Sequence, residues 1–525
     1  MRYVYGLTAA LLLGGAAATL TIGPVGAQTA QNEPGTISAA TPRPNAPMSF
    51  ADLAARLQPA VVNISTRQSI TVNRSQQLPP GLEEFFRQFG VPSPGGDDDN
   101  NSGGSGNGPV TQRGGSLGSG FVVSADGYIV TNNHVVSPAR TGAVVEQIVV
   151  TLSDRREFEA ELVGRDTASD LALLKIKGAT NLPFVRFGDS TTTRVGDWVV
   201  AIGNPFGLGG TVTAGIVSAL HRNIGSGAYD RYIQTDASIN MGNSGGPMFD
   251  LNGNVIGINT ALISPTGGNV GIGFAIPAEQ ARPVIEALQR GQRPQRGYIG
   301  VGLQPLDENI AAALGIPKNR GELIRSVTPG GGAARAGIQQ GDVVVTVNNH
   351  PVTQDESLAY LVAQQPVGSK IPVEIFRNGQ RRVVTVTVGE RPTDEELAKL
   401  SGVETETPVT DPAEGQQSTG QKSTRASLGI TVQTLTPEIA RSLRISDVNV
   451  KGVVVASVDA SSAAASELRA GDIILSINQR PTTTPEQAAA VVDAARAAGR
   501  NSVLVLYRRG NFPPVYAGIE LAKAR

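Results

Sequence analysis

The chain contains no cysteine and only three histidines (His134, His221 and His350) among its 525 residues. The lack of cysteine excludes disulfide bonds, cysteine nucleophiles, thiolate metal sites and iron–sulfur clusters. The scarcity of histidine disfavours a polyhistidine metal centre, so we expect no metal and no other cofactor. A mechanism that depends on histidine therefore has three candidates.

An excess of charge of one sign is also missing, because 44 basic and 45 acidic residues leave a formal net charge of −1. No long-range field draws such a chain onto nucleic acid, and we expect no nucleic-acid partner. The 63 glycines and 33 prolines indicate many turns and loops. The length exceeds the roughly 250–300 residues at which single hydrophobic cores stop growing, so we expect several domains.

The N-terminus begins Met1-Arg2 and continues with an uncharged stretch to Ala27. A positive start, an apolar middle and a small-residue exit predict a signal peptide over residues 1–27, cleaved near Ala27. The alternative is an uncleaved membrane anchor, because the charge-free stretch is nearly long enough to span a bilayer. Its Gly, Thr and Pro content lowers its hydrophobicity and favours the signal peptide. Export without cysteine fits the bacterial periplasm.

Two segments have the composition of irregular chain. Residues 28–48 are rich in Pro, Ala, Thr and Asn, and we expect them to be disordered. Residues 74–115 form a long loop rich in Gly, Ser, Asp and Asn, interrupted by an aromatic cluster at Phe85, Phe86 and Phe89. The cluster either docks elsewhere, for instance on another subunit or at an active site, or forms a small local core.

Short β-rich runs recur between Leu117 and Leu262, which is typical of antiparallel barrels or sandwiches. Asp126-Gly127 and Asn252-Gly253 are hairpin-type turns. A helical pattern from Pro277 to Gln289 ends at Gly291, and we place the end of a first domain, residues 49–291, there. The predicted strands are Gly120–Ser124, Tyr128–Thr131, Gln147–Leu152, Leu171–Ile176, Trp198–Ile202, Thr211–Leu220 and Val255–Ala261.

The remaining chain contains an internal repeat of roughly ninety residues. Gly341-Asp342-Val343-Val344 in the first copy corresponds to Gly471-Asp472-Ile473-Ile474 in the second. We name residues 297–391 the first module and residues 426–522 the second module. Residues 404–425 between them are polar and rich in Thr, Gln and Glu, which predicts a flexible linker.

The segment Gly242-Asn243-Ser244-Gly245-Gly246-Pro247 is the most specific motif. A serine hydroxyl attacks a peptide carbonyl when a base takes its proton and hydrogen-bond donors receive the developing oxyanion. Glycines around the serine let the backbone aim the N–H groups of Gly242 and Ser244 at one point. The alternative is an ordinary glycine-rich turn.

Two further motifs supply a base and an acid. His134 follows the predicted strand that ends at Thr131, and Asp170 precedes the apolar strand Leu171–Ile176. Each residue alone is weak evidence, since histidine is often structural and aspartate often forms turns. The order His134, Asp170, Ser244 is that of chymotrypsin-type proteases, which makes the combination far more specific.

The segments TNNHVV, DLALLKI and GNSGGP, the segment Gly203–Gly207 and the two downstream modules resemble the HtrA/Do (DegP-like) family of serine endoproteases. The resemblance covers nearly the whole chain after residue 27. It implies a mainly β chain, with a chymotrypsin-like double β-barrel protease domain followed by two α+β PDZ domains. It also implies homo-oligomers built on trimers, and misfolded envelope proteins as substrates, with chaperone activity beside proteolysis.

Carried over residue by residue, the resemblance implies that Ser244 is the nucleophile, His134 the general base and Asp170 the group that orients the imidazole. The loop Gly242, Asn243 and Ser244 then forms the oxyanion hole. Two departures stand out. Asn243 replaces the aspartate of digestive trypsin-like enzymes, which excludes activation through a newly cut N-terminus. Met241 replaces the proline common in the family.

The primary specificity pocket of this protease class has its floor six residues before the serine, which is Ser238 here, beside Ile239. No carboxylate occupies that position, so selection of Lys or Arg is disfavoured. With Gly271, Ile272 and Gly273 as a pocket wall, we expect cleavage after Val, Ala or Ile.

The family's PDZ domains bind peptide C-termini at an apolar-Gly-apolar loop, where the peptide adds as a strand to a sheet edge. In the first module these residues are Tyr298, Ile299, Gly300 and Val301. In the second module they are Leu428, Gly429 and Ile430. An ordinary strand entry is the alternative in both cases.

Two other functions stay open beside the quality-control endopeptidase. One is a PDZ-based peptide-binding chaperone or scaffold with a vestigial protease site. An intact triad argues against it, because a decayed enzyme should have lost at least one member. The other is a signalling protease with a single regulatory substrate, which shares the same chemistry.

Overall fold

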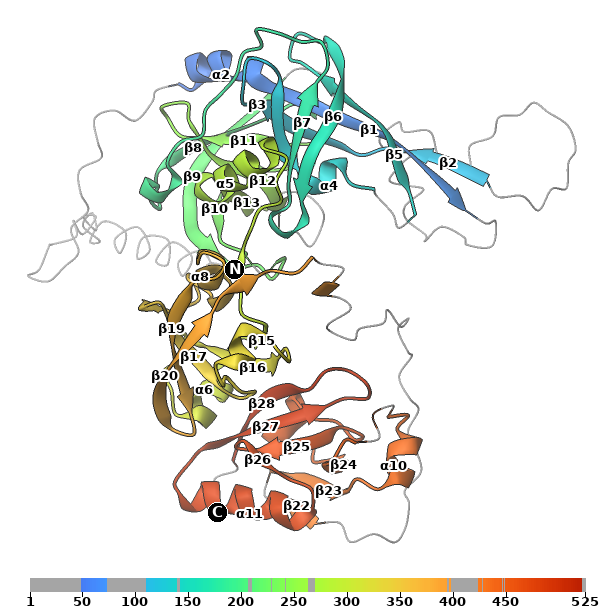
Figure 1. Cartoon of the computed structure of the whole chain (residues 1–525), viewed down its shortest axis with the longest axis vertical. Helices are drawn as coiled ribbons and strands as arrows, with labels where there is room; N and C mark the ends of the chain where they lie inside the picture. Colours follow the sequence, from blue (N-terminus) through green and yellow to red (C-terminus); the bar gives the residue numbers. More distant parts are fainter. Residues whose placement is uncertain are drawn as a thin grey trace, which may run out of the picture. The chain divides into compact units, whose positions relative to one another are not determined.

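The computed structural model describes most of the chain after residue 48 (Figure 1). The predicted signal peptide, the segment 28–48, the aromatic cluster Phe85, Phe86 and Phe89, and residues 401–423 lie outside the described residues. The described ranges are 49–72, 110–138, 142–205, 210–227, 229–240, 242–262, 270–393, 396–397, 424–426, 428–445, 447 and 449–521.

The first barrel of the described chain is antiparallel and closes on itself. Its strands are ordered β1-β3-β4-β7-β6-β5, and pairing of β1 with β5 completes the ring. Strand β2 pairs antiparallel with the last residues of β1, Gln68–Val72. Strand β7 is almost completely buried, as its continuous apolar sequence predicts. A helix and a 3-10 turn precede these strands, and the bounds are α2 Ala51–Leu57, η1 Gln58–Ala60, β1 Val61–Val72, β2 Val110–Gly114, β3 Leu117–Val122, β4 Tyr128–Asn132, β5 Val144–Thr151, β6 Glu157–Asp166 and β7 Leu171–Ile176.

The second barrel is also closed, with the strand order β10-β13-β12-β11-β8-β9. A helix, α5 (Ala278–Gln289), follows its last strand, as the periodicity of the sequence predicts. Each barrel has its own apolar core, built from Val, Ile, Leu, Ala, Met and Phe. The strands are β8 Trp198–Gly203, β9 Thr211–Arg222, β10 Tyr232–Thr235, β11 Pro247–Phe249, β12 Val255–Leu262 and β13 Gly273–Pro277.

The first module is a sheet with the order β15-β16-β17-β19-β20 and short helices. Its β14 pairs with β21 near the end of the module, apart from this sheet. The bounds are β14 Gly297–Tyr298, β15 Val301–Gln304, α6 Glu308–Leu314, β16 Glu322–Val327, α7 Gly332–Arg335, β17 Val343–Val347, β18 His350–Pro351, α8 Leu358–Ala363, β19 Lys370–Arg377, β20 Gln380–Thr387 and β21 Gly389–Glu390.

The second module repeats this topology in the order β22-β23-β24-β25-β27-β28. Its sheet has one additional strand, β22, before the repeat unit. This strand includes Thr424 and Arg425, the last two residues of the predicted linker. The bounds are β22 Thr424–Ala426, β23 Ile430–Thr434, α10 Pro437–Ser442, β24 Val453–Val458, η5 Ala463–Ser466, β25 Ile473–Ile477, β26 Arg480–Pro481, α11 Pro485–Ala497, β27 Ser502–Arg508 and β28 Val515–Glu520.

The same buried ion pair recurs in both modules. Asp342 accepts two hydrogen bonds of 2.6 Å from the Arg377 guanidinium and one of 2.8 Å from the Gln339 N–H. In the second module Asp472 accepts two bonds of 2.8 Å from Arg509. Asp342 and Asp472 are each only 1% exposed. The repeat therefore preserves a bidentate contact that ties the start of β17 or β25 to the end of β19 or β27.

Removing the arginine from this pair should destabilise the first module. Arg377→Ala leaves the Asp342 carboxylate buried without its cation, which costs about 3–5 kcal/mol. We expect hydrogen-exchange protection of β17 and β19 in the full chain to fall by about 100-fold or more. The control is Arg381→Ala, whose exposed pair with Glu374 contributes at most about 1 kcal/mol. Equal protection in the two variants would contradict the assigned role.

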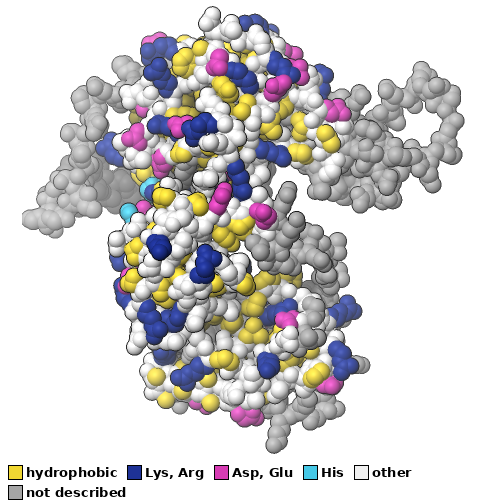
Figure 2. All heavy atoms as spheres, viewed as in Figure 1, with side chains coloured by type: hydrophobic (Ala, Val, Ile, Leu, Met, Phe, Trp, Pro, Cys, Tyr) yellow, Lys and Arg dark blue, Asp and Glu magenta, His cyan; other side chains and the backbone are white. Residues whose placement is uncertain are grey.

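The positions of charge on the surface agree with the even composition. Figure 2 shows Lys and Arg side chains interspersed with Asp and Glu over the visible face.

Among the described residues, no helix is both long and apolar enough to cross a membrane.

Candidate functional site

Strand pairing brings the histidine and aspartate segments together. Strands β4 and β7 are neighbours, and Asn132 at the end of β4 pairs with Leu171 at the start of β7. His134 lies two residues beyond Asn132, in the short helix α4 (Asn133–Val136). Asp170 lies one residue before Leu171. The two residues, 36 positions apart in sequence, therefore meet at one edge of the first barrel.

Asp170 binds His134 through both carboxylate oxygens. Its Oδ2 lies 2.7 Å from His134 Nδ1, and its Oδ1 accepts the backbone N–H of His134 at 2.9 Å. The Asp170 carbonyl also accepts the Asn133 N–H and the Asn132 side-chain amide. These bonds fix the carboxylate relative to the imidazole. Such an arrangement leaves Nε2 of the imidazole to act on a reacting group.

Thr260, which the sequence analysis did not single out, completes this environment. Its hydroxyl donates to Asp170 Oδ2 at 2.9 Å from strand β12 of the second barrel. No local motif marks Thr260, because only the meeting of the two barrels brings it to Asp170. The carboxylate thus receives three hydrogen bonds from protein donors.

Asp166 stabilises the turn that contains Asp170. Asp170 has a left-handed backbone (φ 53°) at the end of the 3-10 turn η2 (Thr167–Ser169), and Asp166 Oδ2 accepts the Ser169 N–H. Arg296, just before the first module, donates to both Asp166 oxygens at 2.9 and 2.6 Å. Burial raises the pKa of Asp166, but the Arg296 contacts and the Ser169 bonds outweigh it, and the net pKa is lowered.

The serine loop runs between β10 and β11 and depends on glycine. Gly242 has φ 102° and Gly245 has φ 82°, both in the region that side chains disfavour. The Asn243 N–H bonds the Asn240 carbonyl at 3.0 Å, and the Gly246 N–H bonds the Asn243 carbonyl at 2.9 Å. The loop is therefore a pair of tight, hydrogen-bonded turns around Ser244.

The close packing of Gly118 brings the serine loop to the histidine segment. A side chain at Gly118 would meet Val135, next to His134, within 2.6 Å and the Ser244 carbonyl within 3.2 Å. A side chain at Gly245 would likewise collide with Ser119 and Thr131 and meet Asn132 N at 3.1 Å, all on the first barrel. The segments that carry His134, Asp170 and Ser244 thus come together where the two barrels meet.

The expected pocket residues also lie near the serine loop. The Ser238 carbonyl accepts the Asn243 side-chain amide at 3.3 Å and the Thr213 hydroxyl at 3.1 Å. Ile239 is buried, and a side chain at Gly273 would lie 2.6 Å from it. Gly271 and Ile272 precede Gly273 at the start of β13. Both predicted pocket segments therefore converge.

The other two histidines lie away from this constellation. His221 lies just beyond the predicted strand Thr211–Leu220, but in the structure it belongs to strand β9, which continues to pair with β10 up to Arg222. Burial, with a smaller contribution from Arg231, lowers its pKa. His350 is exposed in β18. Neither side chain has the carboxylate contact that His134 makes.

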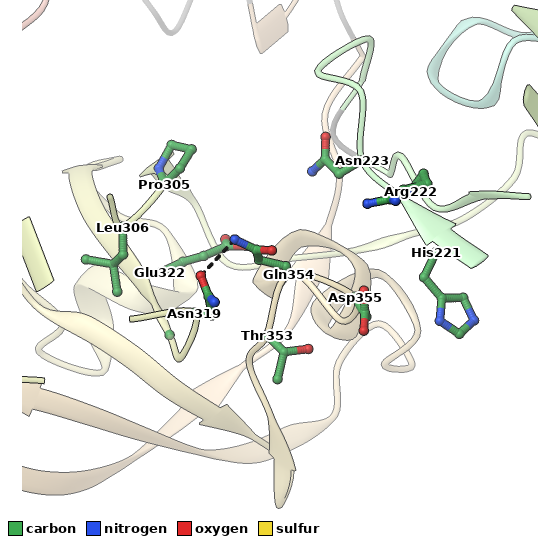
Figure 3. Close-up of a pocket in the computed structure, with 11 residues that line it drawn as sticks. His221, Arg222, Asn223, Pro305, Leu306, Asn319, Glu322, Thr353, Gln354 and Asp355 are labelled. Atoms are coloured by element: carbon green, nitrogen blue, oxygen red, sulfur yellow. Dashed lines mark hydrogen bonds between the residues drawn. The ribbon is translucent and has the colours of Figure 1, made fainter. Parts of the chain in front are cut away.

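His221 helps to line a cavity of about 360 Å³ (Figure 3). Arg222 and Asn223 line it beside first-module residues such as Glu322, whose pKa burial raises to about 7. Gln354 donates to Asn319 across one wall at 2.9 Å. Among the described residues that line it, none belongs to the predicted triad.

The two predicted peptide-binding loops have similar backbones, but the strands that follow them differ in whether their outer edge is free. Gly300 and Gly429 both have positive φ (79° and 77°), and their carbonyls accept the N–H groups of Thr328 and Asp459. Strand β15, which follows the first loop, is an edge strand among the described residues. Strand β23, which follows the second loop, is already paired with β22 along Thr424–Ala426. In the described part of the chain, the first module therefore presents this edge for strand addition, whereas β22 covers it in the second module.

No group of three or more His, Asp or Glu side chains in the described ranges is arranged to hold a metal ion.

Comparisons with known proteins agree with this architecture. The trypsin-like peptidase domain matches residues 118–258, and the PDZ domain matches residues 297–388 and 417–506. A Brucella suis protein named "Probable periplasmic serine endoprotease DegP-like" is 42% identical over 486 residues, covering 89% of this chain and 88% of that relative. A Rhizobium meliloti protein of the same name is 40% identical, covering 87% and 88%.

Solved structures give the same relationship. The structure titled "HtrA-type protease AlgW with decapeptide" has 39% identity and a TM-score of 0.51, and the match covers 66% of this chain and 99% of that one. A variant of the same protease with a decapeptide has 41% identity and a TM-score of 0.52, covering 66% and 98%. With two closed barrels, two PDZ domains and close relatives along most of its length, the chain belongs to the DegP-like family of HtrA serine endoproteases.

Proposed function

We propose that this endoprotease cleaves unfolded or misfolded cell-envelope proteins without ATP, through an acyl-enzyme formed on Ser244. His134 takes the proton of the Ser244 hydroxyl as it attacks the peptide carbonyl and later returns a proton to the leaving amine. Asp170 holds the imidazole and stabilises its cation. The observation that carries the proposal is the 2.7 Å bond between His134 Nδ1 and Asp170 Oδ2, beside a serine loop packed on the same barrel edge.

The oxyanion hole in this proposal is the loop Gly242, Asn243 and Ser244. The N–H groups of Gly242 and Ser244 receive the negative charge that develops on the carbonyl oxygen. The Asn243 side chain bonds the Ser238 carbonyl instead, which connects the loop to the pocket. The positive φ of Gly242 supports this assignment, because only glycine adopts it without strain.

We expect the pocket to accept small or medium apolar side chains. Ser238 and Ile239, with Gly271, Ile272 and Gly273 opposite, offer no carboxylate to a lysine ammonium, and burying an unpaired charge is costly. Two fluorogenic peptides that differ only in Val or Lys at the cleaved position should differ in kcat/KM by about 100-fold in favour of Val. Equal or faster cleavage after Lys would refute this pocket assignment.

The PDZ domains extend this function to peptide recognition. We assign binding of substrate C-termini to Tyr298, Ile299, Gly300 and Val301, where a peptide strand adds to the open edge of β15. The related protease solved with a decapeptide supports peptide binding in the family. At Leu428, Gly429 and Ile430 a peptide would have to displace β22. The first module is therefore the expected sensor of substrate ends.

Export and assembly complete the proposal. The relatives are named periplasmic, which supports a periplasmic location and a signal peptide cleaved near Ala27. The family resemblance adds a trimer-based homo-oligomer and a chaperone activity beside proteolysis. The N-terminal sequence of the exported protein tests the cleavage site, because an anchored protein would retain residues 1–27.

Active-site labelling separates this enzyme from a scaffold with a vestigial site. Purified mature protein is treated with a fluorophosphonate probe in the presence and absence of a chelator. We expect one label on Ser244, with equal yield in both conditions, because the mechanism needs no metal. If Ser244 stays unlabelled while the protein still suppresses aggregation of an unfolded substrate, the scaffold function replaces the protease.

A further inference from the structure

Behind the serine loop lies a second serine, Ser119, that is completely buried in the middle of β3. Its backbone N–H donates to the Ser244 carbonyl at 2.8 Å. Its hydroxyl donates to the Gly242 carbonyl and accepts the Asn204 N–H at 2.8 Å. One residue of the first barrel therefore binds the serine loop at two points.

These two contacts lie on either side of the Ser244 N–H, which is one of the two proposed oxyanion donors. Because peptide units are planar, fixing a carbonyl also fixes the N–H of the next residue. Ser119 fixes the peptide after Gly242 through its hydroxyl and the peptide after Ser244 through its N–H. The Ser244 N–H lies between these two peptides. Its direction is thereby determined from both sides.

Ser119 is itself held rigidly. The Thr131 hydroxyl donates to the Ser119 carbonyl at 2.7 Å, and Asn63 donates to the Asn204 carbonyl at 2.9 Å. The segment that contains Asn204 packs directly on the loop, because a side chain at Gly203 would collide with Asn243. The Ser119 hydroxyl is thus the polar contact that joins β3, this segment and the serine loop.

We propose that Ser119 is a positioning residue of the protease, whose hydroxyl holds the Gly242–Ser244 loop in the geometry that receives the oxyanion. The inference rests on Ser244 as the nucleophile. Ser119 touches neither substrate nor reacting atoms in this assignment. It acts through the Gly242 carbonyl. Without the hydroxyl, that carbonyl and the Asn204 N–H are both buried without this partner, and the loop must rotate to find others.

The test compares Ser119→Ala with Ser190→Ala in the full mature chain. Ser190 is a matched control, because it is also buried and also donates one hydrogen bond and accepts one, both with Glu279 of α5 and not with the serine loop. We expect kcat to fall about 10- to 100-fold in Ser119→Ala with little change in KM, since one oxyanion donor is worth about 10²–10³-fold. Ser190→Ala should keep kcat within about twofold.

A readout specific to the oxyanion separates positioning from general destabilisation. A peptide boronate that forms a tetrahedral anion on Ser244 should lose affinity for Ser119→Ala by the same factor as kcat/KM, but not for Ser190→Ala. Ser119→Thr keeps the hydroxyl and should restore activity to within about threefold. If Ser119→Ala does not fold, Ser119→Cys replaces it, since a thiol is a weak donor and acceptor.

The outcomes are distinguishable. Equal kcat and boronate affinity in the Ser119 and Ser190 variants would overturn the positioning role while the protease assignment stands. Continued cleavage by a Ser244→Ala variant would instead overturn the nucleophile on which the role rests.

Discussion

Ser244→Ala should abolish detectable proteolysis, with kcat falling about 10⁶-fold. The reason is that no other hydroxyl in the assigned mechanism can form the acyl-enzyme, and in a related triad system the loss of the serine costs about that factor. The measurement is degradation of fluorescently labelled, unfolded casein by purified mature protein and its variant. A chelator should leave the wild-type rate unchanged.

The variant must be shown to fold, because an unfolded protein would also be inactive. Ser244 is only partly buried, and its side chain is small, so Ser244→Ala should keep the thermal unfolding profile of the wild type. If the variant still cleaves casein and loses activity with the chelator, a metal-dependent hydrolase would be the better assignment. If neither protein cleaves, but both prevent casein aggregation, the scaffold function gains support.

The sequence predicts the strands best where burial is complete. Leu171–Ile176 was predicted with the correct bounds, since a continuous apolar run has no solvent face to interrupt it. Strand β6 was missed although Glu157, Glu159 and Glu161 alternate with less polar residues, which is the pattern of a half-buried strand. Strand β11, with three residues, is too short to give any pattern.

In the candidate site, the sequence predicts residues that a local turn requires, but not residues that act through contacts distant in sequence. The need for glycine at position 242 follows from the tight turn that a serine nucleophile requires, and the residue has φ 102°. Thr260 and Ser119 carry no such signal. Thr260 acts through a partner 90 positions away in sequence, and Ser119 acts through one 123 positions away. Only the meeting of the two barrels brings these partners together. Buried polar residues of this kind are therefore found in the structure and not in the sequence.

The internal repeat shows a further limit. The aligned sequences predict two equivalent peptide-binding loops, and both have a positive-φ glycine. They do not predict that β14 pairs with β21 while β22 pairs with β23. Both are edge pairings of very short strands, and such strands have little local preference for one partner over another. The functional difference between the modules thus comes from pairing outside the repeated motif.

Asp170→Asn should lower kcat about 10⁴-fold with little change in KM, through the tautomer of His134. All three hydrogen-bond partners of the Asp170 carboxylate are donors in the assigned state: the His134 backbone N–H at Oδ1, and His134 Nδ1–H and the Thr260 hydroxyl at Oδ2. An asparagine NH₂ cannot face the backbone N–H, so it turns towards Nδ1. The imidazole then carries its proton on Nε2 and cannot accept the Ser244 proton.

Two further variants make this explanation specific. Thr260→Val removes one donor but leaves the tautomer unchanged, so kcat should fall only about tenfold or less. Asp250→Asn changes a partly buried turn carboxylate that accepts hydrogen bonds from Asn252 and Asn254, and activity should stay within about twofold. Retention of a tenth or more of wild-type kcat by Asp170→Asn would contradict the orienting role of Asp170. An equally large loss in Thr260→Val would instead place the sensitivity in the carboxylate's position and not in the histidine tautomer.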